Sequence, residues 1–405
     1  MIKLVKPTTL TVCFIFGLVV LFSRCINGSS FKSTDVRGPQ YAGSKACLSC
    51  HKNIFSSWSH TAHFRTSALV KTLPPNWVTS KSFVFNDSVK LVVAKIDSTT
   101  SQVEYVNAQP VLTKPFHVAI GSGDKAASFG YWQNGNLYQL PLTYFAAIHG
   151  WANSPGFPSE EPYFYRPILM RCFECHASFA KEAADATAGL GALSIDSASI
   201  VYGIDCERCH GPATNHVQYH TQNPSEKESK YIAKWKSLSR EQKLDACAVC
   251  HSGNDIALQY STFGFKPGDT LANYYFPFSS GSAESDVHGK QMQLLAASRC
   301  FQVSKTLECS SCHKLHETSP QMPSTLSASC ISCHHNGSHI NCPVAARLTS
   351  PLQNNCIDCH MPYLASKKIN IQAESRQSAR DYLLRTHRIA IYPEESKKIL
   401  VNQKN

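Results

Sequence analysis

The sequence lacks a second long apolar run. Apart from Leu10–Phe22, no stretch of its 405 residues is long and uncharged enough to cross a bilayer, which excludes a chain that spans a membrane several times. The single run follows Lys3 and Lys6 and ends at Arg24, a pattern typical of a signal peptide or short anchor rather than a buried core helix. We expect residues 1–24 to direct export, and the rest to be periplasmic or otherwise extracytoplasmic.

The end of this segment leaves three outcomes open. Cys25 stands where a lipoprotein carries its lipidated cysteine, but Arg24 occupies the place of a small residue. Lipidation of Cys25, cleavage a few residues later and an uncleaved anchor are all compatible with the sequence. Membrane association through the N-terminus is therefore one expectation.

The sequence also lacks an interleaved basic and aromatic face, although its net charge is +11. Without such a face, the positive charge alone does not support nucleic-acid binding. We expect no nucleic-acid partner.

Cysteine is abundant, with 18 residues, and most of it follows one pattern. Seven times the chain reads Cys-x-x-Cys-His. The paired cysteines are Cys47 and Cys50, Cys172 and Cys175, Cys206 and Cys209, Cys247 and Cys250, Cys309 and Cys312, Cys330 and Cys333, and Cys356 and Cys359. The histidines that follow them are His51, His176, His210, His251, His313, His334 and His360.

This spacing matches covalent haem attachment. Two thiols three positions apart on a helical turn can add to the vinyl groups of one haem, and the next residue presents an imidazole to the iron. Structural zinc pairs need no histidine after the second cysteine, and a set of disulfides needs none either. The sequence therefore predicts seven covalently bound haem c groups.

Haem also changes the charge balance. Without Lys3, Lys6 and Arg24 the formal charge is +8. Seven haems carry about 14 ionisable propionates, so the holoprotein would be near −6. Much of the basic excess is then counter-charge for propionates.

Methionine is scarce: outside the export segment only Met170, Met292, Met322 and Met361 remain. Bis-histidine ligation is therefore favoured over histidine–methionine ligation for most irons, which implies low reduction potentials. Eleven histidines stand outside the motifs. They are His60, His63, His117, His149, His216, His220, His288, His316, His335, His339 and His387. Since seven irons need at most seven of them, at least four have other roles.

The motifs are unevenly spread, with one near residue 47 and six between residues 172 and 360. In the gap, Ser82–Val106 favours strands, and Asn134-Gly135 between two apolar stretches predicts a hairpin. Ser239 and Gln242 form a capping box that opens a helix into Cys247–His251, and Ala373–Arg385 is interpreted as another helix.

We expect mainly short α-helices and loops packed around covalent haems with a small β-rich insert, α+β overall. The predicted divisions are 1–24 (signal), 40–79 (first haem segment), 80–145 (β-rich insert) and 146–393 (six-haem domain).

Several segments resemble multihaem cytochromes related to the tetrahaem type of ammonia oxidisers. The similar stretches are 41–46 and 58–63 around the first motif, 203–216 and 244–253 around the third and fourth, 139–156 in the gap, and 356–362 with 386–389 at the end. The stretches around Cys206 and Cys356 are the most specific.

The resemblance implies distal ligands. His63, His216 and His387 match the family's early, middle and late distal histidines, and His316 lies three residues after His313, where the second histidine usually reaches a neighbouring haem. His288 and His339 complete the predicted set. Multihaem nitrite reductases of this superfamily replace one proximal histidine by lysine. No Cys-x-x-Cys-Lys occurs here, so that specific catalytic site is absent.

Two classes of function remain. The first is an electron carrier whose mostly bis-histidine haems connect a membrane quinol-side donor to other redox proteins in a respiratory pathway. The second is an oxidoreductase in which one five-coordinate haem acts on a small nitrogen or sulfur compound. The fold cannot choose between them, because related proteins do both. We favour the carrier and assign no catalytic residue. In an oxidising compartment we expect a disulfide between Cys300 and Cys342, which flank the fifth and sixth motifs; two separate buried thiols are the alternative.

The motif count makes a direct prediction. Because seven complete motifs are present, fully matured protein should carry seven covalent haems, and acid–acetone should extract none. The mass of the intact holoprotein measures the count. A mass that fits six haems or fewer contradicts it.

Overall fold

The structure is a computed structural model. It describes residues 31–71, 77, 82–183, 194–277, 285–318, 323–334, 348 and 355–402. The export segment, His335, His339 and Cys342 lie outside these residues. Among the described residues, no helix has the length and apolar character needed to cross a membrane.

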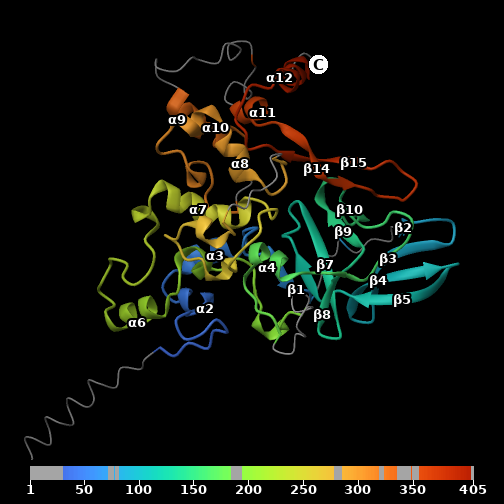
Figure 1. The fold of residues 1–405 in the computed structure, drawn as a ribbon, viewed down its shortest axis with the longest axis horizontal. Coiled ribbons are helices and arrows are strands. Elements are labelled where there is room, and N and C mark those ends of the chain that lie inside the picture. The colour runs from blue at the N-terminus through green and yellow to red at the C-terminus, as the bar shows by residue number, and fades with distance from the viewer. Residues whose placement is uncertain are drawn as a thin grey trace, which may run out of the picture.

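Strands form one half of the molecule and short helices the other (Figure 1). The larger sheet is antiparallel and contains β1 (Ser67–Leu69), β6 (Val118–Ile120), β7 (Ala126–Gln133), β8 (Asn136–Gln139), β9 (Leu142–Phe145), β10 (Gly150–Asn153) and β11 (Arg166–Pro167). The second sheet is a meander of β2 (Ser82–Val84), β3 (Val89–Ile96), β4 (Thr99–Val106) and β5 (Gln109–Pro115). Two further pairs join β12 (Ala177–Phe179) to β13 (Val201–Tyr202) and β14 (Tyr363–Ile371) to β15 (Arg380–Arg385).

The two large sheets share one aromatic core. Leu91 and Val93 of β3 point inward at alternate positions, as expected for a strand with one buried face. They pack with Phe129 of β7 and with Trp151 of β10, from the other sheet. Gln102 of β4 is fully buried, and its amide both donates to the Leu142 carbonyl and accepts from the Leu142 N–H. This exchange connects the two sheets through otherwise apolar surroundings.

This architecture corrects the sequence-based fold class. The expectation of mainly short helices with a small β insert is wrong, because antiparallel strands extend from Ser67 to Pro167 and recur in the β12–β13 and β14–β15 pairs. The segment interpreted as a helix, Ala373–Arg385, instead contains strand β15. Its Tyr382, together with Ile371 of β14, is buried against Phe145 of β9, so tertiary packing overrides the local helix pattern.

Two local predictions are confirmed. Asn134 and Gly135 form the tight turn between β7 and β8 with positive φ values of 51° and 76°, as an Asn-Gly hairpin requires. Ser239 and Gln242 form the reciprocal capping box of α7 (Arg240–His251), which runs into the fourth motif.

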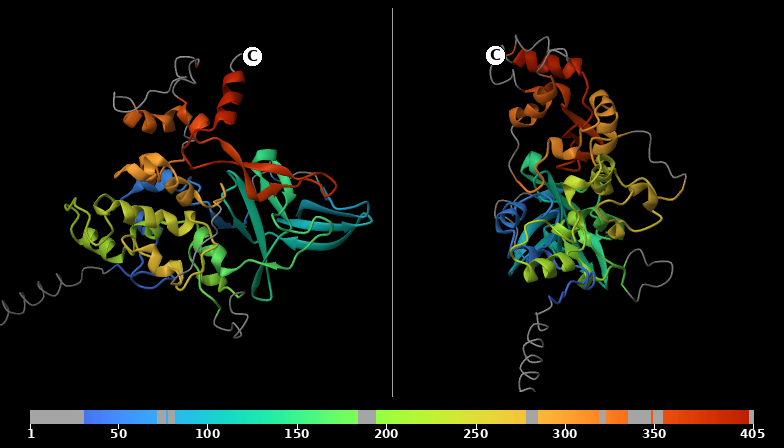
Figure 2. Two further views of the ribbon diagram at one scale, coloured as in Figure 1. Left: turned by 45° about the horizontal axis from the view of Figure 1, so that its top comes forward. Right: turned by 90° about the vertical axis from the view of Figure 1, so that its left-hand side faces the viewer.

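The helices are short, and a complete motif lies in five of the eleven α-helices that the described residues form. The α-helices are α2 (Ser44–Cys47), α3 (Lys52–Trp58), α4 (Met170–His176), α5 (Cys206–His210), α6 (Thr214–Gln222), α7, α8 (Gln291–Ala296), α9 (Arg299–Val303), α10 (Pro323–His334), α11 (Cys356–His360) and α12 (Pro393–Asn402). The 3-10 turns are η2 (Ala146–Ile148), η4 (Ser197–Ser199), η5 (Trp235–Ser237), η6 (Thr262–Gly264), η7 (Leu271–Tyr274) and η8 (Cys309–Ser311). Both figures place α10 and α11 at the end of the molecule opposite α2 and α6 (Figures 1 and 2).

A buried ion cluster joins the start of the described chain to the third motif. Arg37 bonds to Asp35 (2.8 Å), Asp205 (2.7 Å) and Glu207 (3.0 Å), and its side chain is only 3% exposed. Glu207 also accepts backbone N–H bonds from Ala42, Gly43 and Ala213. These bonds hold the segment before α2 against α5.

Replacing Arg37 by Met should therefore lower stability substantially. The change leaves three buried carboxylates without their cation, and breaking a buried pair in this way costs about 3–5 kcal/mol. Denaturant unfolding of the holoprotein, followed by far-ultraviolet circular dichroism, measures the loss.

The matched control is Arg65→Met. Arg65 pairs with Asp124 at 3.0 Å, but both side chains are about half exposed, at 41% and 50%. Its loss should cost only about 0–1 kcal/mol. Equal losses in the two variants would show that the Arg37 cluster is not a structural centre.

Candidate haem-attachment sites

The seven motifs lie on single helical turns or at helix ends. The second, third and seventh lie in α4, α5 and α11, and the fourth and sixth end α7 and α10. The first begins at the last residue of α2, and the fifth begins at η8. Asp205 caps α5 by accepting from the Arg208 N–H at 2.9 Å, and Asn355 caps α11 through the Asp358 N–H at 3.3 Å. Each cap fixes where the helical turn begins and therefore where its two thiols point.

Thiols of different motifs contact one another. Four such contacts each join one sulfur to a sulfur of another motif. In each, hydrogen bonding to the other sulfur, with burial second, raises the pKa of one of the two cysteines. The pairs are Cys47 with Cys206, Cys175 with Cys250, Cys247 with Cys309, and Cys330 with Cys356. These contacts make neighbours of the first and third motifs, the second and fourth, the fourth and fifth, and the sixth and seventh.

Two further contacts complete the order. Cys209 of the third motif lies close enough to Cys247 of the fourth to raise the pKa of that thiol. Ser329, just before the sixth motif, donates to the carbonyl of Ser311 in the fifth at 2.8 Å. The attachment turns therefore form one row in the order first, third, fourth, fifth, sixth and seventh, with the second beside the fourth.

Four predicted distal histidines face a proximal histidine of another segment. The ring centroids lie 6.4 Å apart for His51 and His216, 6.2 Å for His63 and His251, 6.1 Å for His210 and His316, and 6.1 Å for His313 and His387. An ion bound between two imidazoles at about 2.0–2.1 Å from each nitrogen would place the ring centroids about 6 Å apart. The donor set and its spacing therefore fit a six-coordinate haem iron at each of these four sites.

Hydrogen bonds to the backbone orient some of these rings. The His216 Nδ1–H donates to the Lys230 carbonyl at 2.8 Å, and the His360 Nδ1–H donates to the Ala390 carbonyl at 2.9 Å. Because a carbonyl only accepts, Nδ1 carries the proton and Nε2 keeps a free lone pair. This is the usual arrangement around a metal-binding histidine.

Burial keeps two of the distal candidates neutral. It lowers the pKa of His63 to about 4, with smaller contributions from His251 and His313. Burial likewise lowers the pKa of His387 to about 4, again assisted by these two imidazoles. Both rings are uncharged at neutral pH, which is the form that binds a metal.

The remaining predicted ligands are less fully described. His288 lies near enough to His176 to lower its pKa, after the larger effect of burial, while the Nδ1 of His176 is 3.0 Å from the Thr66 hydroxyl. His339 lies outside the described residues, so its assignment stays a prediction. Among the described residues, no ring contact joins His360 to a second histidine.

Some histidines outside the predicted set have other bonds. His117 accepts the Trp132 N–H at Nδ1 (2.8 Å), so its proton is on Nε2 and that nitrogen is no ligand in this tautomer. His60 donates from Nδ1 to the Ser56 carbonyl at 2.7 Å and is exposed. The sequence showed neither these bonds nor the role of the Lys230 and Ala390 carbonyls, because backbone partners leave no residue pattern.

Comparison with known proteins supports this chemistry. Residues 46–89 and 165–211 match the family model described as cytochrome c554 and c-prime, and these two stretches contain the first three motifs. The match supports a multihaem c-type cytochrome. Covalently bound haem c and electron transfer are accordingly the coarse assignment for the chain.

The other comparisons add little. No curated protein sequence matches significantly. The outer cell wall cytochrome OcwA has a similar structure over 89% of this chain and 81% of its own, with a TM-score of 0.48 and 16% sequence identity.

Replacing His216 by Ala should open one iron. The Cys206, Cys209 and His210 attachment group is unchanged, so covalent haem content should stay at the wild-type level. The iron held by His51 should lose its second imidazole and become high-spin or water-ligated, with a raised potential. Electron paramagnetic resonance of the purified variant measures the change.

His220→Ala is the matched control. His220 lies on the same helix α6, with its ring 4.6 Å from that of His216, but it faces no proximal histidine. Its spectrum should remain that of the wild type. An unchanged number of low-spin haems in His216→Ala would show that His216 is no ligand.

Proposed function

We propose that this chain is an exported heptahaem cytochrome c that carries electrons along a row of mostly bis-histidine haems in a respiratory pathway. Haem c bound at the seven motifs would supply reversible one-electron iron chemistry at each. The observation that supports the proposal most strongly is the continuous contact between neighbouring attachment turns.

The chain's own residues have three tasks in this proposal. Paired cysteines such as Cys206 and Cys209 hold each group covalently, so it cannot exchange during turnover. The histidine after each pair is the proximal ligand, and His63, His216, His316 and His387 are distal ligands on four irons. Imidazole on both sides favours low potentials, and it closes these irons to substrates.

The proposal extends to partners and location. A row of haems with low reduction potentials would take electrons from a membrane quinol-side donor at one end and pass them to a protein acceptor at the other. Export would follow from the N-terminal segment, with Cys25 or an uncleaved anchor as the means of membrane association. The division into a first haem segment, a β-rich insert and a six-haem domain belongs to the same proposal.

One observation favours a second candidate, an oxidoreductase. Among the described residues, His176 and His360 show no ring pairing of the 6 Å kind with another histidine. An iron held by one of these two residues would be where a small nitrogen or sulfur compound binds. The four paired sites would be unsuited to this, since an iron held there would already have an imidazole on each side.

Added small ligands test which irons have two imidazole ligands and which have an open position. Cyanide or nitric oxide, added to the oxidised or reduced holoprotein respectively, should perturb none of the four irons with paired imidazoles and at most the remaining three. Quantified electron paramagnetic resonance, with optical titration, counts the irons affected. Binding at four or more irons would contradict the proposed ligation, whereas saturable binding at one would favour the enzyme.

A further inference from the structure

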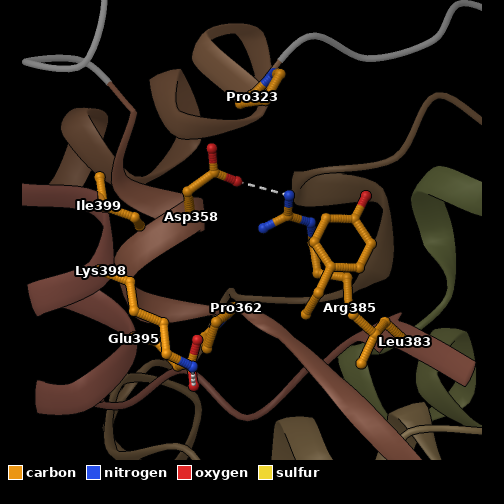
Figure 3. A pocket seen from close by; sticks show the side chains of 9 residues that line it. Pro323, Asp358, Pro362, Leu383, Arg385, Glu395, Lys398 and Ile399 are labelled. Carbon is orange, nitrogen blue, oxygen red and sulfur yellow. Dashed lines mark hydrogen bonds and ion pairs between the residues drawn. The ribbon is translucent and has the colours of Figure 1, made fainter. Parts of the chain in front are cut away.

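A cavity of about 540 Å³ lies beside the seventh motif, at the end of the row of attachment turns. Its walls come from the start of α10, from α11, from the β14–β15 hairpin and from α12. Figure 3 shows Glu395, Lys398 and Ile399 on one side and Leu383 and Arg385 on the other, with Asp358 between them. The volume falls within the roughly 300–1,000 Å³ that small-molecule sites occupy.

The cavity lies on the side of α11 away from Cys356. Cys356 contacts Cys330 of α10, whereas Asp358, two residues further on, lines the cavity. Two residues along a helix correspond to a rotation of about 200°, so the two side chains point in opposite directions. The cavity therefore lies across α11 from the Cys356 thiol, beside the same short helix that carries the seventh motif.

The charged groups of the cavity are already paired. Arg385 bonds to Asp358 at 2.6 Å and to the carbonyls of Ile357 and Met361, and Lys398 bonds to Glu395 at 2.8 Å. These four charges sum to zero, so an ionic ligand would have to break an existing pair. An uncharged ligand would not.

The rest of the lining is apolar and accessible. Tyr363 is 47% exposed and Leu383 is 53% exposed, and both belong to the hairpin that forms one wall. Pro323, Pro362 and Ile399 complete the apolar surface. Large apolar side chains left exposed around a hollow are typical of a ligand site.

We propose that this cavity binds an uncharged aromatic electron carrier of the quinone class, which exchanges electrons with the row at the seventh motif. The redox role of the site rests on the proposed function, but ligand binding does not. In the donor direction, a quinol bound here would give up two electrons, one at a time, to haem c held at the motifs. Its two hydroxyl protons would pass to bulk water through the open side of the cavity, and the product would be the quinone.

Equilibrium dialysis of menadione against the oxidised holoprotein tests binding without electron transfer. Saturable binding at one site per chain is expected. Leu383→Asp places a charge in the apolar wall and should weaken binding at least about tenfold. Val111→Asp is the control, because Val111 is 55% exposed on β5 in the other sheet, and its dissociation constant should stay within about twofold of wild type.

Several results of the dialysis experiment would overturn the proposed ligand site. Absence of saturable binding, or binding that Leu383→Asp leaves unchanged, overturns the proposal, as does equal weakening in both variants. Preference for the dianion anthraquinone-2,6-disulfonate over menadione overturns the uncharged class. Dithionite reduces the haems of the same samples whether or not a ligand is bound in the cavity. The redox activity of the haems is therefore measured separately from ligand binding, and failure of the electron-carrier proposal can be told apart from failure of this site.

Stopped-flow mixing with menadiol then tests the redox role. Wild type and Val111→Asp should be reduced at the same rate, and Leu383→Asp should be slower by about the factor lost in affinity at subsaturating menadiol. Equal rates in all three proteins would show that the cavity is not where electrons enter.

Discussion

The arrangement of this protein depends on histidines that cross from one segment to another. His216 follows the third motif but faces His51 of the first, and His316 follows the fifth but faces His210 of the third. His63, early in the chain, faces His251 of the fourth motif. A metal bond across each pair would close a long loop, so metal binding and folding are coupled. The same crossings bring successive attachment turns into contact.

The sheets give this arrangement a fixed support. The aromatic core between the two large sheets is independent of the motifs, and β1 and β6 run into the segments that carry Thr66 and His117. The β14–β15 hairpin leaves α11 and packs Ile371 and Tyr382 against Phe145 and Ala152 of the larger sheet. The seventh motif is therefore tied to the strands as well as to α10. This gives the cavity beside it one wall of sheet and another of helix.

The attachment chemistry could be predicted from the sequence, because covalent haem needs its residues at fixed local spacing. The Asn134-Gly135 turn and the Ser239 cap were predictable for the same reason. The extent of the sheets was not: β14 and β15 are held by partners more than 200 residues away in the chain, at Phe145 and Ala152. Which proximal histidine each distal histidine faces was likewise hidden, since it depends on how segments cross in space. The carbonyls that fix His216 and His360 belong to the backbone and have no sequence signature.

The spatial order of the seven irons tests the proposed row of haems most directly. A crystal structure of the holoprotein, with irons located by anomalous scattering, gives each iron's nearest neighbours. We expect neighbours in the order first, third, fourth, fifth, sixth and seventh, with the second beside the fourth, in one unbroken row. Irons in sequence order, or a gap that separates the sixth and seventh from the rest, would contradict it.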